Sequence, residues 1–177
     1  MKKKNILKVV LTYKTIQHRM KIIAESISKY YQNSSNKLVI IGLLRGSFIF
    51  IADLCREITI AHQIDFMHVS SYANDIFSDH KIKIIKDLEL DIRGKHALLV
   101  DDIIDSGYSL KKIYEFLIFK NPKSLLICAL LDKPTCRLVN IEASWIGFTI
   151  SNDFVVGYGM DYAQNYRHLP YIGKLIL

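Results

Sequence analysis

Uninterrupted apolar runs recur along this chain and limit the folds open to it. The runs KLVIIGLL (37–44), HALLVDD (96–102) and SLLICALL (124–131) are each long enough for one strand, and they do not alternate with polar residues. Strands that are apolar on both sides must be covered on both faces, which is typical of parallel sheets flanked by helices. The chain is therefore predicted to be an α/β protein with a mostly parallel central sheet.

Helical periodicity predicts three helices around this sheet. Residues 15–31 and the residues after Gly107 carry apolar side chains at intervals of three or four, and residues 46–58 form another helical segment with Ser47 available as N-cap. The first stripe consists of Ile16, Met20, Ile23, Ile27 and Tyr30, and the other of Leu110, Ile113, Tyr114 and Leu117. Residues 64–72 are expected to be a strand, polar residues 73–81 an exposed, mobile loop, and residues 82–94 a short strand followed by a turn.

Residues 140–177 have a different pattern from the rest of the chain. Aromatic residues and glycines follow one another at short intervals there, without a long helical stripe. Short strands and loops are expected, forming a smaller lobe on which a planar ligand could stack. With 177 residues the chain is predicted to be a single domain, 1–177, with a core over about 38–135 and a hood over about 136–177 plus part of the N-terminus.

Cysteine usage and hydropathy predict the compartment. The three cysteines, Cys55, Cys128 and Cys136, have no CxxC spacing, and an odd number cannot all pair within one chain. No apolar run approaches the roughly 20 residues that span a bilayer. Lys8 and Lys14 interrupt the apolar start, which is read as mature sequence. A reducing, cytoplasmic location without membrane association is expected.

Positive charge is concentrated near the N-terminus. Residues 1–37 hold nine Lys/Arg and one acid, a net charge of +8, whereas the remainder holds 15 basic and 16 acidic residues, a net charge of −1. Such a segment can attract nucleic acid by counterion release, or it can be the solvated face of a helix. Because no interleaved pattern of aromatic residues for stacking on bases accompanies these lysines, the solvated face is favoured and nucleic acid is not the expected partner.

Three aspartates lie where the predicted central strand ends, in ALLVDDIIDSGYSL (97–110). Asp101, Asp102 and Asp105 are expected at the carboxyl edge of the sheet, where open parallel sheets bind ligands. Two adjacent buried carboxylates repel each other unless a cation or hydroxyl groups compensate them. A magnesium ion held through a sugar diol would supply both.

The residues after Asp105 have the composition of an anion-binding turn. Ser106 and Ser109 supply hydroxyls, and Gly107 permits a turn into a helix whose free N–H groups and positive dipole end suit a phosphate. Neither a Walker A loop nor a GxGxxG turn is present. The stretch indicates a seat for a phosphorylated sugar, the alternative being an Asp N-cap with exposed neighbours.

Residues 97–110 resemble the signature of type I phosphoribosyltransferases, which binds phosphoribosyl pyrophosphate. Four other stretches are similar to the hypoxanthine-guanine branch of that family. They are LLRGSFIFIADL as a pyrophosphate loop, SSY as the start of a lid, LDKP with a purine-contacting lysine, and DFVVGYGMDYAQNYRHLPYIG as a base-binding tail. The resemblance extends from about residue 38 to 173 and implies the type I phosphoribosyltransferase fold.

The resemblance also implies an enzyme and its substrates. Ribose 5-phosphate would pass from phosphoribosyl pyrophosphate to N9 of hypoxanthine or guanine, giving IMP or GMP and pyrophosphate in purine salvage, with Mg²⁺ as cofactor. Asp101 and Asp102 would hold the ribose hydroxyls directly or through the metal, and Asp105 would act as base toward N7. Asp105, Ser106, Gly107, Tyr108 and Ser109 would form the 5′-phosphate cradle. Relatives suggest a homodimer or homotetramer.

The remaining roles carried by the resemblance concern pyrophosphate, purine and lid. Leu44, Arg45, Gly46 and Arg167 would bind pyrophosphate, with a non-proline cis peptide common in that loop. The purine would be bound by four residues. Lys133 would contact its O6 atom, Phe154 its ring face and Val155 its edge, while Asp161 would lie near the 2-position and near a metal. Ser71 and Tyr72 would begin the lid.

Three departures from the family pattern are visible. The family usually has Glu at the position of Asp101 and often Lys at that of Arg45, and its lids commonly carry a Ser-Gly pair that residues 73–81 lack. Without the resemblance, Phe154 and Val155 could equally be core residues. His68, His80 and His96 have no metal-ligand spacing and are expected to be structural or solvated.

Two other functions stay open at this point. One is a phosphoribosyltransferase that prefers xanthine or adenine, although the Lys133 cation argues against an amino group at C6. The other is an RNA-binding regulator on the same fold, for which the basic N-terminal segment is the sole support.

Overall fold

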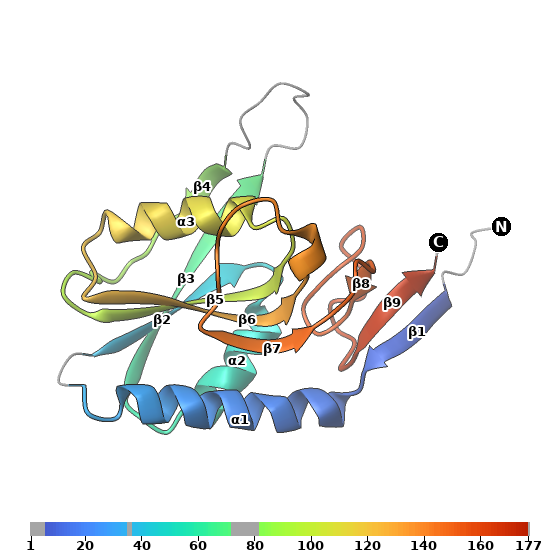
Figure 1. Cartoon of the computed structure of the whole chain (residues 1–177), viewed down its shortest axis with the longest axis horizontal. Coiled ribbons are helices and arrows are strands. Elements are labelled where there is room, and N and C mark those ends of the chain that lie inside the picture. The colour runs from blue at the N-terminus through green and yellow to red at the C-terminus, as the bar shows by residue number, and fades with distance from the viewer. Residues whose placement is uncertain (1–5, 35–36, 72–81, 177) are drawn as a thin grey trace.

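The computed structural model describes residues 6–34, 37–71 and 82–176, which form two β-sheets and three α-helices (Figure 1). The helices are α1 (Tyr13–Tyr31), α2 (Phe48–Glu57) and α3 (Tyr108–Ile118), with a short 3₁₀ helix η1 (Pro134–Cys136). The strands are β1 (Ile6–Leu11), β2 (Leu38–Leu44), β3 (His62–Ser71), β4 (Ile82–Lys86), β5 (His96–Ile104), β6 (Ser124–Asp132), β7 (Trp145–Thr149), β8 (Val155–Val156) and β9 (Ile172–Ile176).

The main sheet has the strand order β4-β3-β2-β5-β6-β7. The pairs β3–β2, β2–β5, β5–β6 and β6–β7 are all parallel. The edge strand β4 is antiparallel to β3. Because the central strands are buried on both faces, continuous apolar runs are what the sheet requires. The α/β class and the mostly parallel sheet are confirmed.

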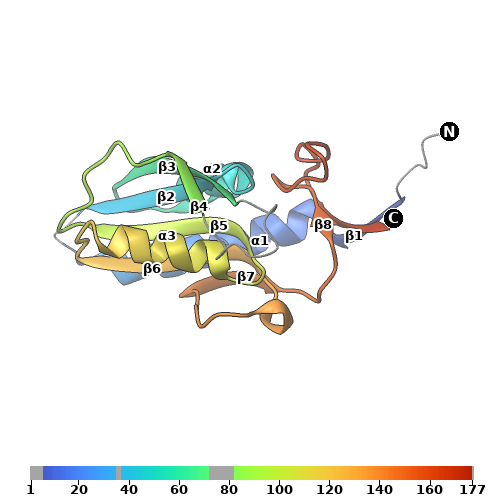
Figure 2. The same ribbon diagram turned by 90° about the horizontal axis from the view of Figure 1, so that it is seen from above.

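The helices cover both faces of this sheet. Helices α1 and α2 lie on one side and α3 on the other, as the two views in Figure 1 and Figure 2 show. Two hydrophobic clusters fill the layers, one between the sheet and the α1/α2 side and one between the sheet and α3. The stripe of α1 is buried as expected up to Ile27, but Tyr30 is 62% exposed and Tyr31 is buried in its place. At four residues after Ile27, Tyr31 faces the sheet, where its ring packs against His96.

Two local expectations differ from the structure. Ser47 occupies the N-cap position of α2, but its side chain makes no capping bond; its hydroxyl donates to the Leu43 carbonyl at 2.5 Å. Strand β5 continues to Ile104, so Asp101 and Asp102 lie within the strand and not beyond its end. The backbone of Asp101 is paired with Ala129 of β6, so the acidic pair is carried by the sheet itself.

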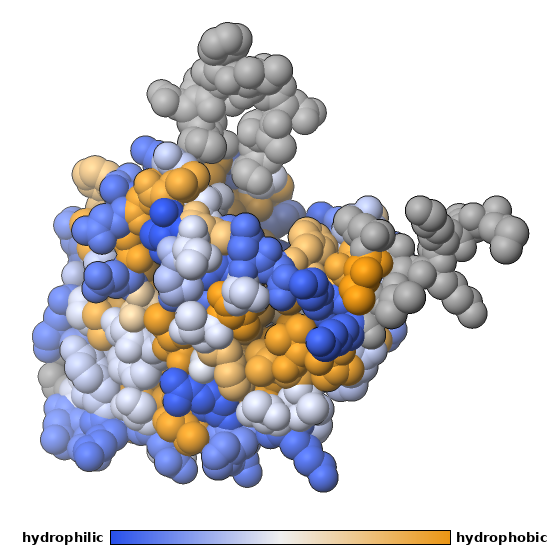
Figure 3. Space-filling model, turned by 45° about the vertical axis from the view of Figure 1, so that its right-hand side comes forward, coloured by the Kyte–Doolittle hydropathy of each residue, from blue (hydrophilic) through white to orange (hydrophobic). Residues whose placement is uncertain are grey.

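The smaller sheet forms the hood and has the order β1-β9-β8. Its strands come from residues near both ends of the sequence, β1 (Ile6–Leu11), β8 (Val155–Val156) and β9 (Ile172–Ile176). Strand β7, which lies in the range expected for the hood, instead pairs in parallel with β6 in the main sheet. Figure 3 turns the hood side forward and shows apolar side chains among hydrophilic ones there. The exposed apolar side chains of the hood strands include Val9, Val10 and Ile176.

Helix α2 and the hood are linked by a hydrogen bond through Asp53. The buried Tyr158 hydroxyl donates to Asp53 at 2.5 Å, and Gln17 of α1 donates to the same carboxylate oxygen at 2.9 Å. Burial raises the pKa of Tyr158, and Asp53 raises it further, so this hydroxyl stays protonated and serves as a donor. The tail around residue 158 is thereby fastened to both helices on this side of the sheet.

In the part of the chain that the structure describes, no helix is both long and apolar enough to cross a membrane.

Asp65 on β3 carries a pH-dependent part of the stability. Its carboxylate accepts from three backbone N–H groups, those of Phe66, Glu89 and Leu90. Burial acts to raise the pKa of Asp65, but these donors and Lys86 outweigh it and lower the pKa. Because the folded pKa lies below the unfolded value of about 3.9, the stabilisation is complete above that pH and is lost as pH falls through the folded pKa.

The Asp65→Asn variant is therefore expected to lose about 1 to 3 kcal/mol at pH 7 and less at pH 3, since the amide cannot accept all three bonds as a carboxylate does. Urea unfolding at the two pH values measures this difference. Equal losses at both pH values would contradict it.

Candidate active site

A cavity of about 540 Å³ opens between the carboxyl edge of the main sheet and the hood. Many of the side chains that the sequence analysis singled out line it: Leu44, Arg45, Gly46, Asp102, Asp105, Lys133, Phe154, Val155, Asp161 and Arg167. They come from β2, β5, the end of β6 and the tail, segments far apart in sequence. The parallel topology brings them together, because the carboxyl ends of parallel strands meet at one edge.

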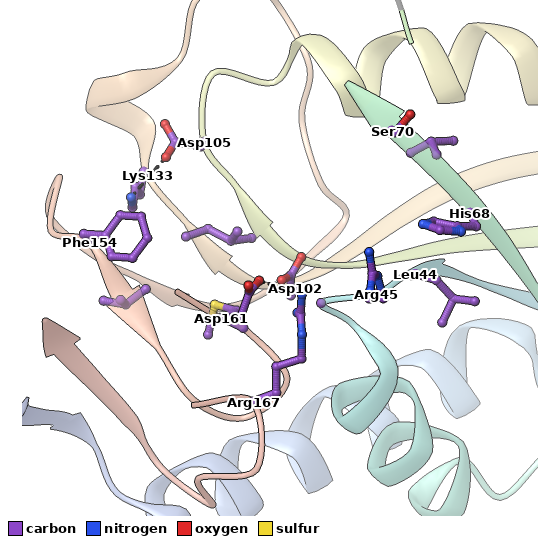
Figure 4. A pocket seen from close by; sticks show the side chains of 15 residues that line it. Leu44, Arg45, His68, Ser70, Asp102, Asp105, Lys133, Phe154, Asp161 and Arg167 are labelled. Atoms are coloured by element: carbon purple, nitrogen blue, oxygen red, sulfur yellow. Dashed lines mark hydrogen bonds and ion pairs between the residues drawn. The ribbon is translucent and has the colours of Figure 1, made fainter. Parts of the chain in front are cut away.

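The residues are arranged in order along the cavity (Figure 4). Lys133, Asp105 and Phe154 lie at one end, Arg45, His68 and Ser70 at the other, and Asp102, Asp161 and Arg167 between them. One end thus combines an aromatic ring with a cation and an anion, and the opposite end carries a guanidinium beside backbone turns.

Asp101 and Asp102 form the acidic pair at the end of β5. Asp102 lines the cavity, and its backbone N–H donates to the Asp101 carboxylate at 3.0 Å. Burial and the neighbouring Asp102 carboxylate raise the pKa of Asp101 well above its usual range. Burial also raises the pKa of Asp102, whereas the positive charge of Arg167 acts to lower it. A cation or hydroxyl donors at this point would stabilise the doubly ionised pair.

The donor set at this pair fits Mg²⁺ when the ion also takes ligands from substrate and water. Mg²⁺ prefers oxygen ligands and is usually bound by one or two carboxylates together with water and phosphate oxygens. Among the described residues no group of three or more His, Cys, Asp or Glu side chains is arranged to hold a metal on its own. Asp161, the third predicted metal residue, pairs with Arg167 at 2.6 Å and accepts from the Gln164 N–H at 2.7 Å.

The loop after β2 passes very close to this acidic pair. The peptide bond between Leu44 and Arg45 is cis, as the resemblance led us to expect. A Cβ atom on Gly46 would lie within 3.0 Å of the Asp102 carboxylate, closer than real Cβ atoms come to such atoms. Gly159 of the tail faces Gly46 from another side, and a Cβ there would run into the Gly46 carbonyl. The backbones of Gly46 and Gly159 and the Asp102 carboxylate therefore meet where neither glycine has room for a side chain.

The phosphate-cradle residues follow β5 directly. Gly107 has φ +85°, a conformation that favours glycine, and is the N-cap of α3. Tyr108 and Ser109 form the first turn of that helix, and Asp105 and Ser106 precede it. Asp105 reaches the cavity described above, whereas Ser106 to Ser109 lie beside it at the mouth of the helix.

Lys133 and Asp105 form an ion pair at the opposite end from Arg45. The Lys133 Nζ atom lies 3.0 Å from an Asp105 carboxylate oxygen, and the side chain of Lys133 is 7% exposed while that of Asp105 is 54% exposed. Phe154, beside them, is half exposed, with Tyr162 edge-on to its ring at 5.7 Å. Phe154 is therefore exposed to the cavity and is not a core residue. Val155 is buried and belongs both to the cavity wall and to the core.

Arg167 is held by the tail itself. It donates to the Gly159 carbonyl at 2.7 Å and to Gln164 at 3.3 Å, in addition to its pair with Asp161. Gln164 also accepts from Arg45 at 3.4 Å, so it lies between the two guanidinium groups. Both predicted pyrophosphate cations are thus present at the cavity wall in one hydrogen-bonded set.

Comparison with known proteins identifies the family. The profile described as phosphoribosyl transferase domain matches residues 10–163. The chain belongs to the phosphoribosyl transferase family. Hypoxanthine phosphoribosyltransferases from Buchnera aphidicola subsp. Schizaphis graminum and Escherichia coli K12 are 56% and 52% identical to it, each match covering 98% of both proteins. The crystal structure of a hypoxanthine phosphoribosyltransferase from Staphylococcus aureus superposes with a TM-score of 0.90 at 43% identity, over 96% of this chain and 91% of that one.

This phosphoribosyl transferase has cavity residues that sequence reasoning missed. They are His68, Val69, Ser70, Ile103 and Met160. His68, for which only a structural or solvated position was expected, lines the cavity. The register explains why: β3 pairs in parallel with β2 so that His68 lies opposite Leu44, at the same edge of the sheet.

The predicted lid falls largely outside the described residues. Ser71 is the last residue of β3, where it pairs with Ile82 of β4. Tyr72 and residues 73–81 lie outside the described part of this phosphoribosyl transferase.

Proposed function

We propose that this phosphoribosyl transferase works in purine salvage, moving the 5-phosphoribosyl group from phosphoribosyl pyrophosphate to N9 of hypoxanthine or guanine. IMP or GMP and pyrophosphate are the products. The observation that carries the assignment is the ion pair of Lys133 and Asp105 beside the open face of Phe154. Full-length relatives at 56% and 52% identity bear the name of this activity.

The ion pair is complementary to one edge of a 6-oxopurine. O6 and N7 of such a base are neighbours on that edge, O6 accepting a hydrogen bond and a protonated N7 donating one. Lys133 can donate to O6 and the Asp105 carboxylate can accept from N7, with the two groups already 3.0 Å apart. Adenine presents an amino group at C6, which would face the Lys133 cation and leave both donors unsatisfied.

The rest of the cavity suits the sugar and its leaving group. With the purine stacked on Phe154, the acidic pair comes next and the Arg45 end last, which is the order of base, ribose and pyrophosphate (Figure 4). Asp101 and Asp102 would hold the ribose hydroxyls. As the bond to the anomeric carbon breaks, positive charge develops on the sugar and negative charge on the pyrophosphate, so the carboxylates and Arg45 and Arg167 stabilise the two ends of the transition state.

The base is activated by one proton transfer. The Asp105 carboxylate takes the proton from N7 as N9 attacks the anomeric carbon, while Lys133 stabilises the charge that moves toward O6. Mg²⁺ held at the acidic pair would neutralise pyrophosphate oxygens. Val155 contacts the base edge through its backbone, and Asp161 lies toward the 2-position.

Three further attributes belong to the proposal. Mg²⁺ dependence is supported by the two adjacent, partly buried carboxylates of Asp101 and Asp102, both of whose pKa values burial raises. A cytoplasmic location is supported by three cysteines that are all unpaired. A homodimer or homotetramer is proposed by analogy with the family.

Initial rates with phosphoribosyl pyrophosphate, Mg²⁺ and each of hypoxanthine, guanine, xanthine and adenine test the function. Turnover of hypoxanthine or guanine above the other bases is expected. Adenine as the best substrate would overturn the assignment, and absence of transfer with structured-RNA binding that survives physiological salt would favour an RNA-binding regulator instead.

Replacing Lys133 by Met tests the O6 contact in particular. Met keeps the length of the side chain and removes its charge, so kcat/KM for hypoxanthine is expected to fall about 10- to 100-fold, the usual value of a hydrogen bond from a charged group. The kcat/KM for adenine, which is already much lower, should change less, so the preference for hypoxanthine over adenine weakens. Lys112→Met, at an exposed position on α3, is the control. Equal losses for both bases would contradict the contact.

A further inference from the structure

We infer that Arg137 is the positioning residue that orients the peptide groups of the 5′-phosphate cradle. It lies after η1, outside the cavity, and the family resemblance attached no role to it. Its guanidinium donates from Nη1 to the main-chain carbonyl of Asp105 at 2.7 Å and from Nη2 to the Asp132 carboxylate at the end of β6. The side chains of Arg137 and Asp132 are only 17% and 10% exposed.

Arg137 is part of a continuous support behind the cradle. The Lys133 N–H donates to the Ile104 carbonyl at 3.0 Å, and the Leu138 N–H donates to the Ser106 carbonyl at 3.0 Å. Three successive carbonyls, those of residues 104, 105 and 106, are therefore all bonded to the segment 133–138. For the middle one the partner is the Arg137 side chain, not a backbone N–H.

These bonds fix the direction of the cradle's donors. In a planar trans peptide the C=O of one residue and the N–H of the next point in opposite directions. The cis bond at Leu44–Arg45 is elsewhere, so the peptides at residues 105–107 are trans. With the Asp105 and Ser106 carbonyls turned toward residues 137–138, the N–H groups of Ser106 and Gly107 point to the opposite side. A bound phosphate accepts from such N–H groups at a helix N-terminus.

The packing around Gly107 supports the same assignment. A Cβ atom at Gly107 would meet Arg137 Cδ and Val139 Cγ2 at 3.1 Å and Ile141 Cγ2 at 2.9 Å. The stem of Arg137 thus presses on the turn whose carbonyl its head group holds. Because Asp132 is buried, it keeps the guanidinium in this one direction, and the adjacent Lys133 holds the Asp105 side chain. Residues 132–137 consequently hold Asp105 by both its side chain and its main chain.

The inference rests on the proposed function, since it takes the cradle's ligand to be the 5′-phosphate of a ribose phosphate. Dissociation constants for IMP and for inosine, which lacks the phosphate, separate this role from general damage to the site. In Arg137→Met, IMP binding measured by calorimetry is expected to weaken about tenfold, while inosine binding changes less than about twofold. Arg137→Lys, which reaches one partner only, should recover part of the loss. Arg93→Met, at an exposed position, is the matched control.

Each outcome has a distinct meaning. Equal weakening of IMP and inosine, or no change for either, overturns the positioning role. If a thermal melt shows that Arg137→Met is not folded, Asp132→Asn is used in its place, because that variant removes the charge that directs the Arg137 guanidinium. Asp132→Asn should weaken IMP binding about threefold and leave inosine binding unaffected. A wild-type protein that binds neither IMP nor phosphoribosyl pyrophosphate would instead refute the proposed function.

Discussion

In the Asp105→Asn variant, kcat for hypoxanthine is expected to fall at least about 100-fold, the lower end of what a general base contributes. The amide has nearly the size of the carboxylate, and its oxygen can still accept from Lys133, so the geometry of the pair at 3.0 Å is preserved. What the amide cannot do is take the proton from N7. The change therefore acts on the reaction and not on the shape of the cavity.

Binding of phosphoribosyl pyrophosphate should be nearly intact in the same variant. In the proposed binding mode the cradle holds the phosphate through N–H groups that the substitution leaves in place. Calorimetry with phosphoribosyl pyrophosphate and Mg²⁺ should therefore give a dissociation constant within about threefold of the wild type. Single-turnover kinetics with saturating base measures the chemical step. Unchanged turnover would remove Asp105 from the role of base. Asp87→Asn, which alters another Asp–Lys pair at 2.7 Å on the surface, is the control.

In the Gly46→Ala variant, kcat/KM is expected to fall by about 100-fold, because displacements near 1 Å in a catalytic constellation have effects of that size. The added methyl would overlap the Asp102 carboxylate, so either the loop of Arg45 or the acidic pair must move. Both belong to the part of the cavity that is proposed to bind the sugar and the pyrophosphate. The KM for phosphoribosyl pyrophosphate should therefore rise more than that for hypoxanthine.

A second glycine provides the control for this variant. Gly94 has φ +68°, and a Cβ added there would have no atom within 4 Å, so Gly94→Ala introduces backbone strain without a collision. It should lower stability by about 1 kcal/mol and leave kinetics unchanged. Steady-state kinetics for both substrates, with a thermal melt of each variant, distinguishes the two. Equal kinetic losses in both variants would contradict the proposed collision with Asp102.

Sequence periodicity was sufficient for the main sheet because its strands are buried on both faces. Runs such as residues 37–44 and 124–131 have few other structures open to them, and the helices between them follow from spacing. The hood was harder to predict. Strand β7 has a mixed pattern because it is an edge strand, and nothing local indicates that it joins β6 and not the hood.

The site was predictable where its chemistry is local in sequence. Asp101, Asp102, Asp105 and Gly107 are close together along the chain, and their types alone indicate a phosphorylated sugar. Lys133, Phe154 and Arg167 could be selected only through resemblance to a family, since as single residues they look like an ordinary charge or core position.

The residues that were missed act through contacts between distant segments. His68 depends on the register between β2 and β3, Gly159 on its approach to the Gly46 carbonyl, and Arg137 on a bond to a carbonyl 32 residues earlier. Such pairings are settled by tertiary packing, which one sequence read alone does not contain.

The first and last strands of the chain, β1 and β9, pair antiparallel with Ile6 opposite Ile176. During synthesis on the ribosome the main sheet emerges well before β9, so the aspartates of β5 can take their places while the hood is still without its central strand. The wall that carries Phe154 and Val155 is then completed only when β9 pairs with β1 and β8. A nascent chain would thus form the part of the cavity proposed to bind the sugar before the part proposed to bind the purine.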